Sequence, residues 1–250
     1  MTDCLRSLIV GNIITIEFFK ERVIVSLFTD KQRGGPLIPL LERDVHLFDL
    51  DNTLYHPNNA ILEQIAPRMR RFISNELSIS IEESNALCDS YYQRYGGTIR
   101  GIQLHHSSVN LNQFSEFSHQ VNLDNVEKAT KLKDALHALK KSRYVFTNSP
   151  LPYATRVLKH IDLYDCFDGI FSVELTGYKM KPDPHAFNTI CQHFGFEASD
   201  AAFYDDQISN LTTAKQLGMR TILVNRGDID KHDACYKTED LPHFMASLIK

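Results

Sequence analysis

The sequence predicts an α/β protein whose core is a doubly wound, Rossmann-like parallel sheet, with a helical cap inserted after the first strand. After residue 141, short apolar runs with strand character alternate with helical periodicities, an alternation typical of parallel sheets. One further strand-like run, Val45–Phe48, precedes a mostly helical block from about residue 58 to residue 140. A helical block that separates one strand from the others is most simply an insertion into the first connection of the sheet.

The chain divides by these patterns into three parts. Residues 8–28 are rich in Ile, Val and Phe, as strands are, and residues 30–36 have the composition of a turn or linker. No role follows from the sequence of this segment. The predicted parts are an N-terminal extension at 1–44, a Rossmann-like core at 45–54 and 141–250, and a helical cap at 55–140.

Periodicity and turn residues predict the individual elements. In the cap, apolar residues recur at spacings of four, four and three, which predicts a helix with one apolar face. These residues are Ile61, Ile65, Met69 and Phe72. Further helical patterns cover 81–95 and 127–141, and glycines at 96 and 97 break the pattern between them. Core strands are predicted at 45–48, 143–147, 169–173, 201–204 and 220–224, with helices at 152–160, 184–194 and 207–217.

The composition excludes several classes of function. With 27 basic and 31 acidic residues, the formal net charge is −4, so the chain has no broad positive field for nucleic acid or anionic membranes. Its five cysteines are scattered and form no Cys-x-x-Cys pair, which disfavours a disulfide framework and a zinc site. The most apolar stretch, residues 8–28, carries four charged side chains and resembles no signal peptide. We therefore expect a cytoplasmic protein without a membrane span.

Polar side chains stand where the predicted strands end. Asp49 and Asp51 follow the first strand, and residues i and i+2 of an extended chain face the same side, roughly 6 to 7 Å apart. One carboxylate can stay ionised as a nucleophile or metal ligand while the other carries a proton to donate. The other polar residues are Thr147 and Asn148 after the second strand, Asp205 and Asp206 after the fourth, and Lys181 in a loop before a helix that begins near Pro184.

Four carboxylates at one edge of a sheet would repel one another strongly without a cation. These positions offer neither His nor Cys, so the all-oxygen set favours magnesium over zinc. Lys181 can offset the charge of a carboxylate and of a phosphate, while Thr147 and Asn148 supply hydrogen bonds to phosphoryl oxygens. Together these residues indicate phosphoryl transfer, a reaction that depends on positioning and charge stabilisation.

The strand-end residues form four short motifs. They are Asp49-Leu50-Asp51-Asn52-Thr53-Leu54, Val145-Phe146-Thr147-Asn148-Ser149, Lys181-Pro182-Asp183-Pro184 and Phe203-Tyr204-Asp205-Asp206. In order and spacing they resemble the four motifs of the haloacid dehalogenase superfamily of aspartate-nucleophile hydrolases. The resemblance covers roughly residues 45 to 225.

This resemblance implies a role for each motif residue. Asp49 would attack phosphorus to form an aspartyl-phosphate, and Asp51 would protonate the leaving group and then activate water. Thr147 would bind a phosphoryl oxygen, and Lys181 would neutralise charge near Asp49. Magnesium would be held by Asp49, by the backbone carbonyl of Asp51 and by Asp206, with Asp205 and Asn210 behind these ligands. Some relatives carry an acid where Asn210 stands, so this chain has one negative charge fewer there.

A narrower resemblance, to pyrimidine 5′-nucleotidases, rests on the tyrosine after the first motif, the run of residues 91–101 and the segment 146–150. It implies a nucleoside 5′-monophosphate as the substrate. Tyr95 and Arg100 in the cap are candidates to contact it, with an aromatic ring for a base and a guanidinium for its carbonyls or for ribose. The alternative for the tyrosines of this helix, Tyr91, Tyr92 and Tyr95, is ordinary packing.

Other functions remain open at this stage. A phosphatase or mutase for another small phosphometabolite, such as phosphoglycolate or a sugar phosphate, would use the same four motifs. A haloacid dehalogenase is disfavoured because dehalogenation needs no leaving-group acid, and Asp51 is present. A non-catalytic phosphate sensor would not need all of the motif residues that the chain retains. The oligomeric state does not follow from the sequence.

Overall fold

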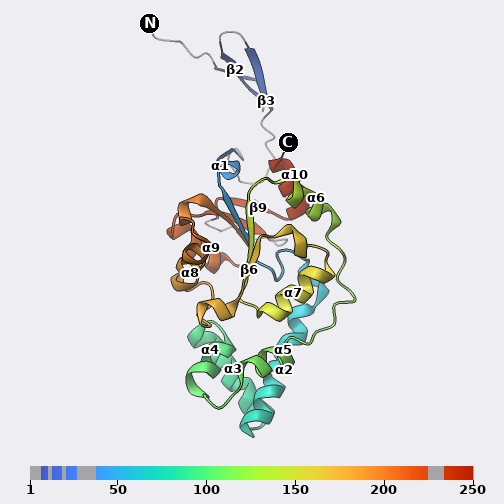
Figure 1. The fold of residues 1–250 in the computed structure, drawn as a ribbon, viewed down its shortest axis with the longest axis vertical. Helices are drawn as coiled ribbons and strands as arrows, with labels where there is room; N and C mark the ends of the chain where they lie inside the picture. Colours follow the sequence, from blue (N-terminus) through green and yellow to red (C-terminus); the bar gives the residue numbers. More distant parts are fainter. Residues whose placement is uncertain (1–6, 11–12, 19–20, 27–37, 225–233, 250) are drawn as a thin grey trace.

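The computed structural model describes residues 7–10, 13–18, 21–26, 38–224 and 234–249 (Figure 1). Within them, two separate sheets form, one antiparallel with three strands and one parallel with six. The antiparallel sheet consists of β1 (Ser7–Val10), β2 (Ile13–Phe18) and β3 (Glu21–Ser26), in the region whose composition predicts strands. The turn or linker predicted at 30–36 lies outside the described residues.

The six-stranded sheet is parallel throughout, in the order β6-β5-β4-β7-β8-β9. Its first strand in the sequence, β4, lies between β5 and β7, with Phe48 opposite Val145 and Tyr204. The carboxyl ends of these three strands therefore meet in the middle of one sheet edge. The strands are β4 (Val45–Phe48), β5 (Ser142–Phe146), β6 (Gly169–Phe171), β7 (Ala201–Asp205), β8 (Arg220–Val224) and β9 (Tyr236–Thr238).

Helices cover both faces of this sheet, as the doubly wound prediction requires, and the fold prediction is confirmed (Figure 1). One face packs against α8 (Pro184–Phe194) and α9 (Ile208–Gln216), with Leu47 and Phe187 in a single apolar cluster. The other face packs against α6 (Thr130–Ala138), α7 (Leu151–His160) and α10 (Leu241–Leu248), with Phe48 and Met245 in a second cluster. The short helix α1 (Ile38–Leu41) precedes β4.

The helices between residues 61 and 118 lie beyond the carboxyl ends of the strands (Figure 1). The long helix α2 (Ile61–Leu77) joins core and cap, because Ile61 packs in the core whereas Ile73 packs in the cap cluster. The other cap helices are α3 (Ile81–Tyr95), α4 (Thr98–His105) and α5 (Leu111–Ser118). The break predicted at the glycine pair is present, and Gly96 ends α3 with a left-handed φ of 77°.

Three details differ from the sequence-based expectation. The helix predicted at 127–141 is shorter, and α6 packs against α10 of the core although it falls inside the predicted cap range. The strand predicted at 169–173 ends at Phe171, where a 3-10 helix follows at Val173–Thr176. Strand β9 and helix α10 extend the core into a segment whose pattern predicts no element. In the part of the chain described here, no helix is long and apolar enough to cross a membrane.

Candidate active site

Asp49 follows the last residue of the central strand β4. Its backbone N–H donates to the carbonyl of Tyr204 at 2.8 Å, which continues the ladder between β4 and β7. Beyond it the chain turns at Asn52, whose φ of 60° lies in the left-handed region that asparagine tolerates better than most residues. The turn brings the Thr53 hydroxyl back to Asp49 Oδ2 at 3.5 Å. Asp49 is thus held at the middle of the sheet edge, with its side chain almost buried.

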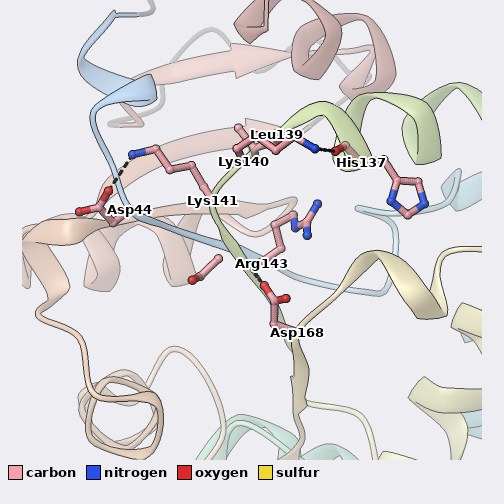
Figure 2. Close-up of a pocket in the computed structure, with 8 residues that line it drawn as sticks. Asp44, His137, Leu139, Lys140, Lys141, Arg143 and Asp168 are labelled. Atoms are coloured by element: carbon pink, nitrogen blue, oxygen red, sulfur yellow. Dashed lines mark hydrogen bonds and ion pairs between the residues drawn. The ribbon is translucent and has the colours of Figure 1, made fainter.

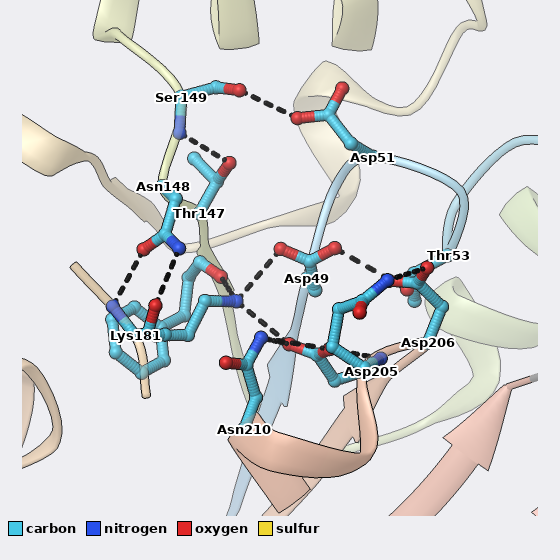
Figure 3. A network of polar contacts seen from close by, with 12 residues as sticks. Asp49, Asp51, Thr53, Thr147, Asn148, Ser149, Lys181, Asp205, Asp206 and Asn210 are labelled. Carbon is cyan, nitrogen blue, oxygen red and sulfur yellow. Dashed lines mark hydrogen bonds and ion pairs between the residues drawn. The ribbon is translucent and has the colours of Figure 1, made fainter. Parts of the chain in front are cut away.

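Lys181 crosses from the loop before α8 to this carboxylate (Figure 3). Its ammonium group donates to Asp49 Oδ1 at 2.8 Å, to Asp205 Oδ2 at 2.9 Å and to the carbonyl of Phe146 at 2.7 Å. An ammonium group has three N–H donors, so these partners use all of them. Lys181 therefore fixes the two acids and places a positive charge beside them, and it keeps no donor for a substrate.

Burial and charge act in opposite directions at this ion pair. Burial by itself would lower the pKa of Lys181, but the carboxylates of Asp205 and Asp49 outweigh it and raise that pKa. Burial raises the pKa of Asp49 well above its usual range despite Lys181, and the charges of Asp205, Asp51 and Asp206 add to the rise. The site holds more negative charge than one lysine compensates.

The two acids after β7 have different surroundings. Asp205 is fully buried, and its oxygens accept from Lys181, from the backbone N–H of Gln207 at 2.7 Å and from the amide of Asn210 at 3.0 and 3.1 Å. Asp206 is partly exposed and accepts one hydrogen bond, from the Gln207 side chain at 2.7 Å. Burial raises the pKa of Asp206 to about 6, and the charge of Asp205 acts in the same direction.

At the end of β5, Thr147 and Asn148 have different hydrogen-bond partners. The hydroxyl oxygen of Thr147 accepts from the backbone N–H of Ser149 at 3.0 Å, so its own O–H remains available as a donor. The Asn148 amide forms a reciprocal pair with the backbone of Lys181, accepting at 2.8 Å and donating at 3.0 Å. Asn148 therefore holds the backbone of Lys181, in the loop before α8. The direct contact with phosphate that the sequence predicts for Asn148 stays a prediction.

Asp51 is turned toward Ser149 rather than toward Lys181 (Figure 3). Three hydroxyl groups surround its carboxylate: Ser149 Oγ lies 2.6 Å from Oδ2, while the phenols of Tyr55 and Tyr153 lie 2.5 and 2.7 Å from Oδ1. Tyr153 was not among the sequence-based candidates, because its place in the first turn of α7 follows no motif spacing. The sequence draws attention to Tyr55 only as the aromatic residue after the first motif.

Comparison with known proteins places this geometry in a family. The family model described as haloacid dehalogenase-like hydrolase matches residues 44–218, which include all four motifs. The chain belongs to this hydrolase family. Phosphate metabolism protein 8 of Saccharomyces cerevisiae is 30% identical over 196 residues, which cover 72% of this chain and 61% of the yeast protein. The chain thus spans about three fifths of the length of that relative.

Two further proteins are similar to this chain, one in sequence and one in fold. Phosphatase MT3486 of Mycobacterium tuberculosis is 29% identical over 156 residues, which cover 54% of this chain and 71% of that protein. The crystal structure of a HAD phosphatase from Thermococcus onnurineus matches with a TM-score of 0.55 and 22% identity, covering 82% of this chain and 97% of that one. At this identity the structural match supports the fold alone.

The cap candidates of this hydrolase form hydrogen bonds within the cap and with one core loop. Tyr95 shares a hydrogen bond of 2.6 Å with His105, and Tyr91 shares one of 2.8 Å with His106, so the rings form one cluster on α3 and α4. Arg100 donates to Gln103 and to the carbonyl of Gly177 at 3.2 Å, which ties the cap to the core loop that leads to Lys181. A substrate contact for Tyr95 or Arg100 stays a prediction.

A separate hollow of about 610 Å³ lies at the opposite end of the sheet (Figure 2). It is bordered by residues just before β4 and at the start of β5, about a strand's length from Asp49. Its cations have protein partners: Lys141 pairs with Asp44 at 2.7 Å, and Lys140 donates to the carbonyl of His137. The candidate residues predicted from the sequence are not among those that line this hollow.

Proposed function

We propose that this hydrolase is a magnesium-dependent phosphomonoesterase that acts through an aspartyl-phosphate on Asp49. One observation carries the proposal: oxygen atoms of Asp49, Asp205 and Asp206 lie within 4.8 Å of one another, with Lys181 bound to the first two. A phosphate group carries further negative charge. It can approach such a cluster only if positive charge beyond that of Lys181 is present.

The donor set fits Mg²⁺. All the candidate ligands are oxygens, which a hard divalent cation prefers. Burial, and after it the charge of neighbouring acids, raises the pKa of Asp49 and of Asp206, and a bound cation would favour the ionised form of both. The oxygens of Asp205 are already engaged by Lys181 and Asn210. We therefore assign the metal to Asp49, Asp206 and the backbone carbonyl of Asp51. Asp205 and Asn210 would not bind the metal, and Asn210 holds Asp205 by hydrogen bonds. When bound, Mg²⁺ would neutralise charge on the phosphoryl oxygens.

The side chains perform the remaining steps. Lys181 holds Asp49 Oδ1, which leaves Oδ2 to attack phosphorus, while the Thr147 hydroxyl donates to a phosphoryl oxygen. Asp51 gives its proton to the departing oxygen as the bond from that oxygen to phosphorus breaks. Asp51 then takes a proton from water, and the resulting hydroxide attacks the aspartyl-phosphate and frees Asp49.

The surroundings of Asp51 favour this reaction over dehalogenation. A halide leaves without a proton, so a dehalogenase has no use for a second acid beside the nucleophile. Here three hydroxyl groups donate hydrogen bonds to the carboxylate of Asp51 and hold it in place. This arrangement supports a reaction whose leaving group needs a proton, as an alkoxide does.

For the substrate we propose a pyrimidine nucleoside 5′-monophosphate. The cap lies over the strand ends and carries the partly exposed ring of Tyr95, an aromatic surface that suits a base. The core supplies phosphate chemistry that any phosphomonoester could use. Discrimination among phosphomonoesters therefore falls to the helices inserted between residues 55 and 140, apart from α6, which packs with the core.

The test is a phosphatase screen of the full chain with UMP, CMP, AMP, GMP, phosphoglycolate and a hexose phosphate. We expect activity that chelation abolishes, that Mg²⁺ restores and that Zn²⁺ does not fully restore, with UMP and CMP hydrolysed fastest. Asp49→Asn should be inactive with every substrate. Activity that survives exhaustive chelation would refute the metal proposal, and transfer of phosphate to a second hydroxyl instead of water would indicate a mutase. Equal or faster hydrolysis of purine nucleotides or phosphoglycolate would refute the pyrimidine proposal alone.

A further inference from the structure

The carboxylate of Asp51 is held unequally at its two oxygens. Oδ1 accepts from two phenols, Tyr55 at 2.5 Å and Tyr153 at 2.7 Å, whereas Oδ2 accepts from the hydroxyl of Ser149 at 2.6 Å. The phenol oxygens lie 3.3 Å from each other. A carboxylate oxygen has two lone pairs, so the two phenols occupy Oδ1 completely.

The two phenols are fixed donors. Tyr55 is 6% exposed and Tyr153 is 3% exposed, and they come from segments 98 residues apart, one after β4 and one in the first turn of α7. Burial raises the pKa of both tyrosines far above the usual range, and the negative charge of Asp51 raises it further. Both side chains therefore keep their O–H protons, and together they supply Oδ1 with two donors.

Tyr153 is also held from its other side. The ring of His119, at the end of the cap helix α5, lies 5.0 Å from the Tyr153 ring between centroids. The Nδ1 of His119 donates to the carbonyl of Ser115 at 2.8 Å, and Arg156 of α7 donates to the His119 carbonyl. The side chain of Tyr153 therefore lies between Asp51 and His119, at the end of the cap helix α5.

We propose that Tyr153, together with Tyr55, is a positioning residue that anchors Oδ1 of Asp51, so that Oδ2 is the oxygen that exchanges the proton during catalysis. This inference rests on the phosphomonoesterase function proposed above. In the first step the O–H bond at Oδ2 breaks and the proton goes to the leaving-group oxygen as its bond to phosphorus breaks and the bond from Asp49 forms. In the second step Oδ2 takes a proton from water as the water oxygen bonds to phosphorus and Asp49 leaves.

Ser149 suits the exchanging oxygen because a hydroxyl both donates and accepts. It donates to Oδ2 when Asp51 is ionised and can accept from it when Asp51 is protonated. Two phenols donate to Oδ1 and fill both of its lone pairs, whereas Ser149 is the one donor to Oδ2 among the described residues, so that Oδ2 keeps a lone pair for the proton. The asymmetry between the two oxygens thus follows from the number of hydroxyl groups that donate to each of them.

The experiment is Tyr153→Phe in the full chain, assayed with Mg²⁺ on UMP and on 4-nitrophenyl phosphate. Nitrophenolate departs without a proton, whereas the nucleoside alkoxide needs one. We expect kcat for UMP to fall about 10-fold or more, part of the 10² to 10⁴ that a positioned acid contributes, and kcat for nitrophenyl phosphate to fall less than about 3-fold. KM should stay within about 2-fold for both substrates, because the phosphate contacts are unchanged.

Tyr204→Phe is the matched control, because it also removes a buried phenol O–H, here one bonded to His46 at 3.0 Å in the core. It should lower stability and leave kcat for both substrates as in the wild type. Tyr55→Phe should reproduce the split of Tyr153→Phe, and the double variant should approach Asp51→Asn. Tyr55→Phe and Tyr153→Phe each remove one donor to Oδ1 of Asp51. If one of these variants folds poorly, the other still tests the proposal.

The outcomes separate the two proposals. If the wild type hydrolyses phosphomonoesters but both tyrosine variants slow the two substrates equally, or slow neither, the positioning role is wrong and the phosphatase function stands. A rise in kcat for UMP would likewise refute positioning, since it would mean that the phenols restrain Asp51 in an unproductive orientation. If the wild type hydrolyses no phosphomonoester, both proposals fail together.

Discussion

Replacing Lys181 by methionine should be among the most damaging single changes in the core of this protein. Lys181→Met keeps the length of the side chain and removes its charge. Asp49 and Asp205 then lose an ion-pair partner at 2.8 and 2.9 Å, in a region where the lysine side chain is 1% exposed. Water cannot replace the lost contacts, so two carboxylates stay buried with their mutual repulsion uncompensated.

The magnitude follows from the distances and the burial. At an effective dielectric constant of about 20, each contact corresponds to about 6 kcal/mol of attraction, most of which offsets the cost of taking the charges out of water. Removing one partner leaves that cost without its compensation, typically about 3 to 5 kcal/mol. Against a total stability of about 5 to 15 kcal/mol, this is a large fraction, and it lowers Tm by about 6 to 20 °C in a domain of this size.

The assay is urea and thermal unfolding followed by circular dichroism, with Lys141→Met as the control. Lys141 pairs with Asp44 at 2.7 Å, a distance no longer than those of Lys181, but the two side chains are 29% and 77% exposed. The control should change stability by less than about 1 kcal/mol. Asp205→Asn added to Lys181→Met should recover part of the loss because it removes one buried charge. Equal destabilisation by the two lysine variants would refute the reasoning, because distance rather than burial would then decide the effect.

Two other predictions concern positions away from the acids. Burial and the charge of Lys141 lower the pKa of His46 to about 4, so the unfolded chain, with a pKa near 6.5, binds a proton that the folded chain excludes. Protonation of His46 in the unfolded chain should therefore lower the free energy of unfolding by about 3 kcal/mol between pH 7 and pH 4. His46→Phe should flatten the pH dependence of this free energy, measured by urea unfolding. The same pH dependence in the variant and the wild type would contradict the prediction. Gly101→Ala should destabilise by about 1 to 3 kcal/mol in thermal unfolding, because the added Cβ would lie 2.1 Å from Cγ of Tyr91, although alanine normally favours a helix interior. A rise in Tm would show that α3 and α4 separate easily.

The succession of strands and helices along the core, and the positions of the motif residues, could be predicted from the sequence because each depends on a local pattern. Alternating strands and helices indicate a parallel sheet, and the carboxyl ends of parallel strands meet at one edge wherever the strands fall in it. The contact of Lys181 with Asp49 follows from that rule across 132 residues. The extent of α6 and the presence of β9 could not be predicted, since a short element is stabilised by the neighbours it packs against rather than by its own periodicity.

The sequence by itself determined which candidate groups gather at the carboxyl edge of the sheet: acids, a lysine and a hydroxyl, with a helical insertion after the first strand. Only the tertiary structure decided how the atoms of these groups are shared. It engages both oxygens of Asp205 with Lys181 and Asn210, commits Asn148 to the backbone of the lysine loop, and places Tyr153 on Asp51 across 102 residues. The physical reason is that hydrogen-bonding capacity is local to each atom, whereas the partner that uses it is chosen by the packing of segments far apart in the chain.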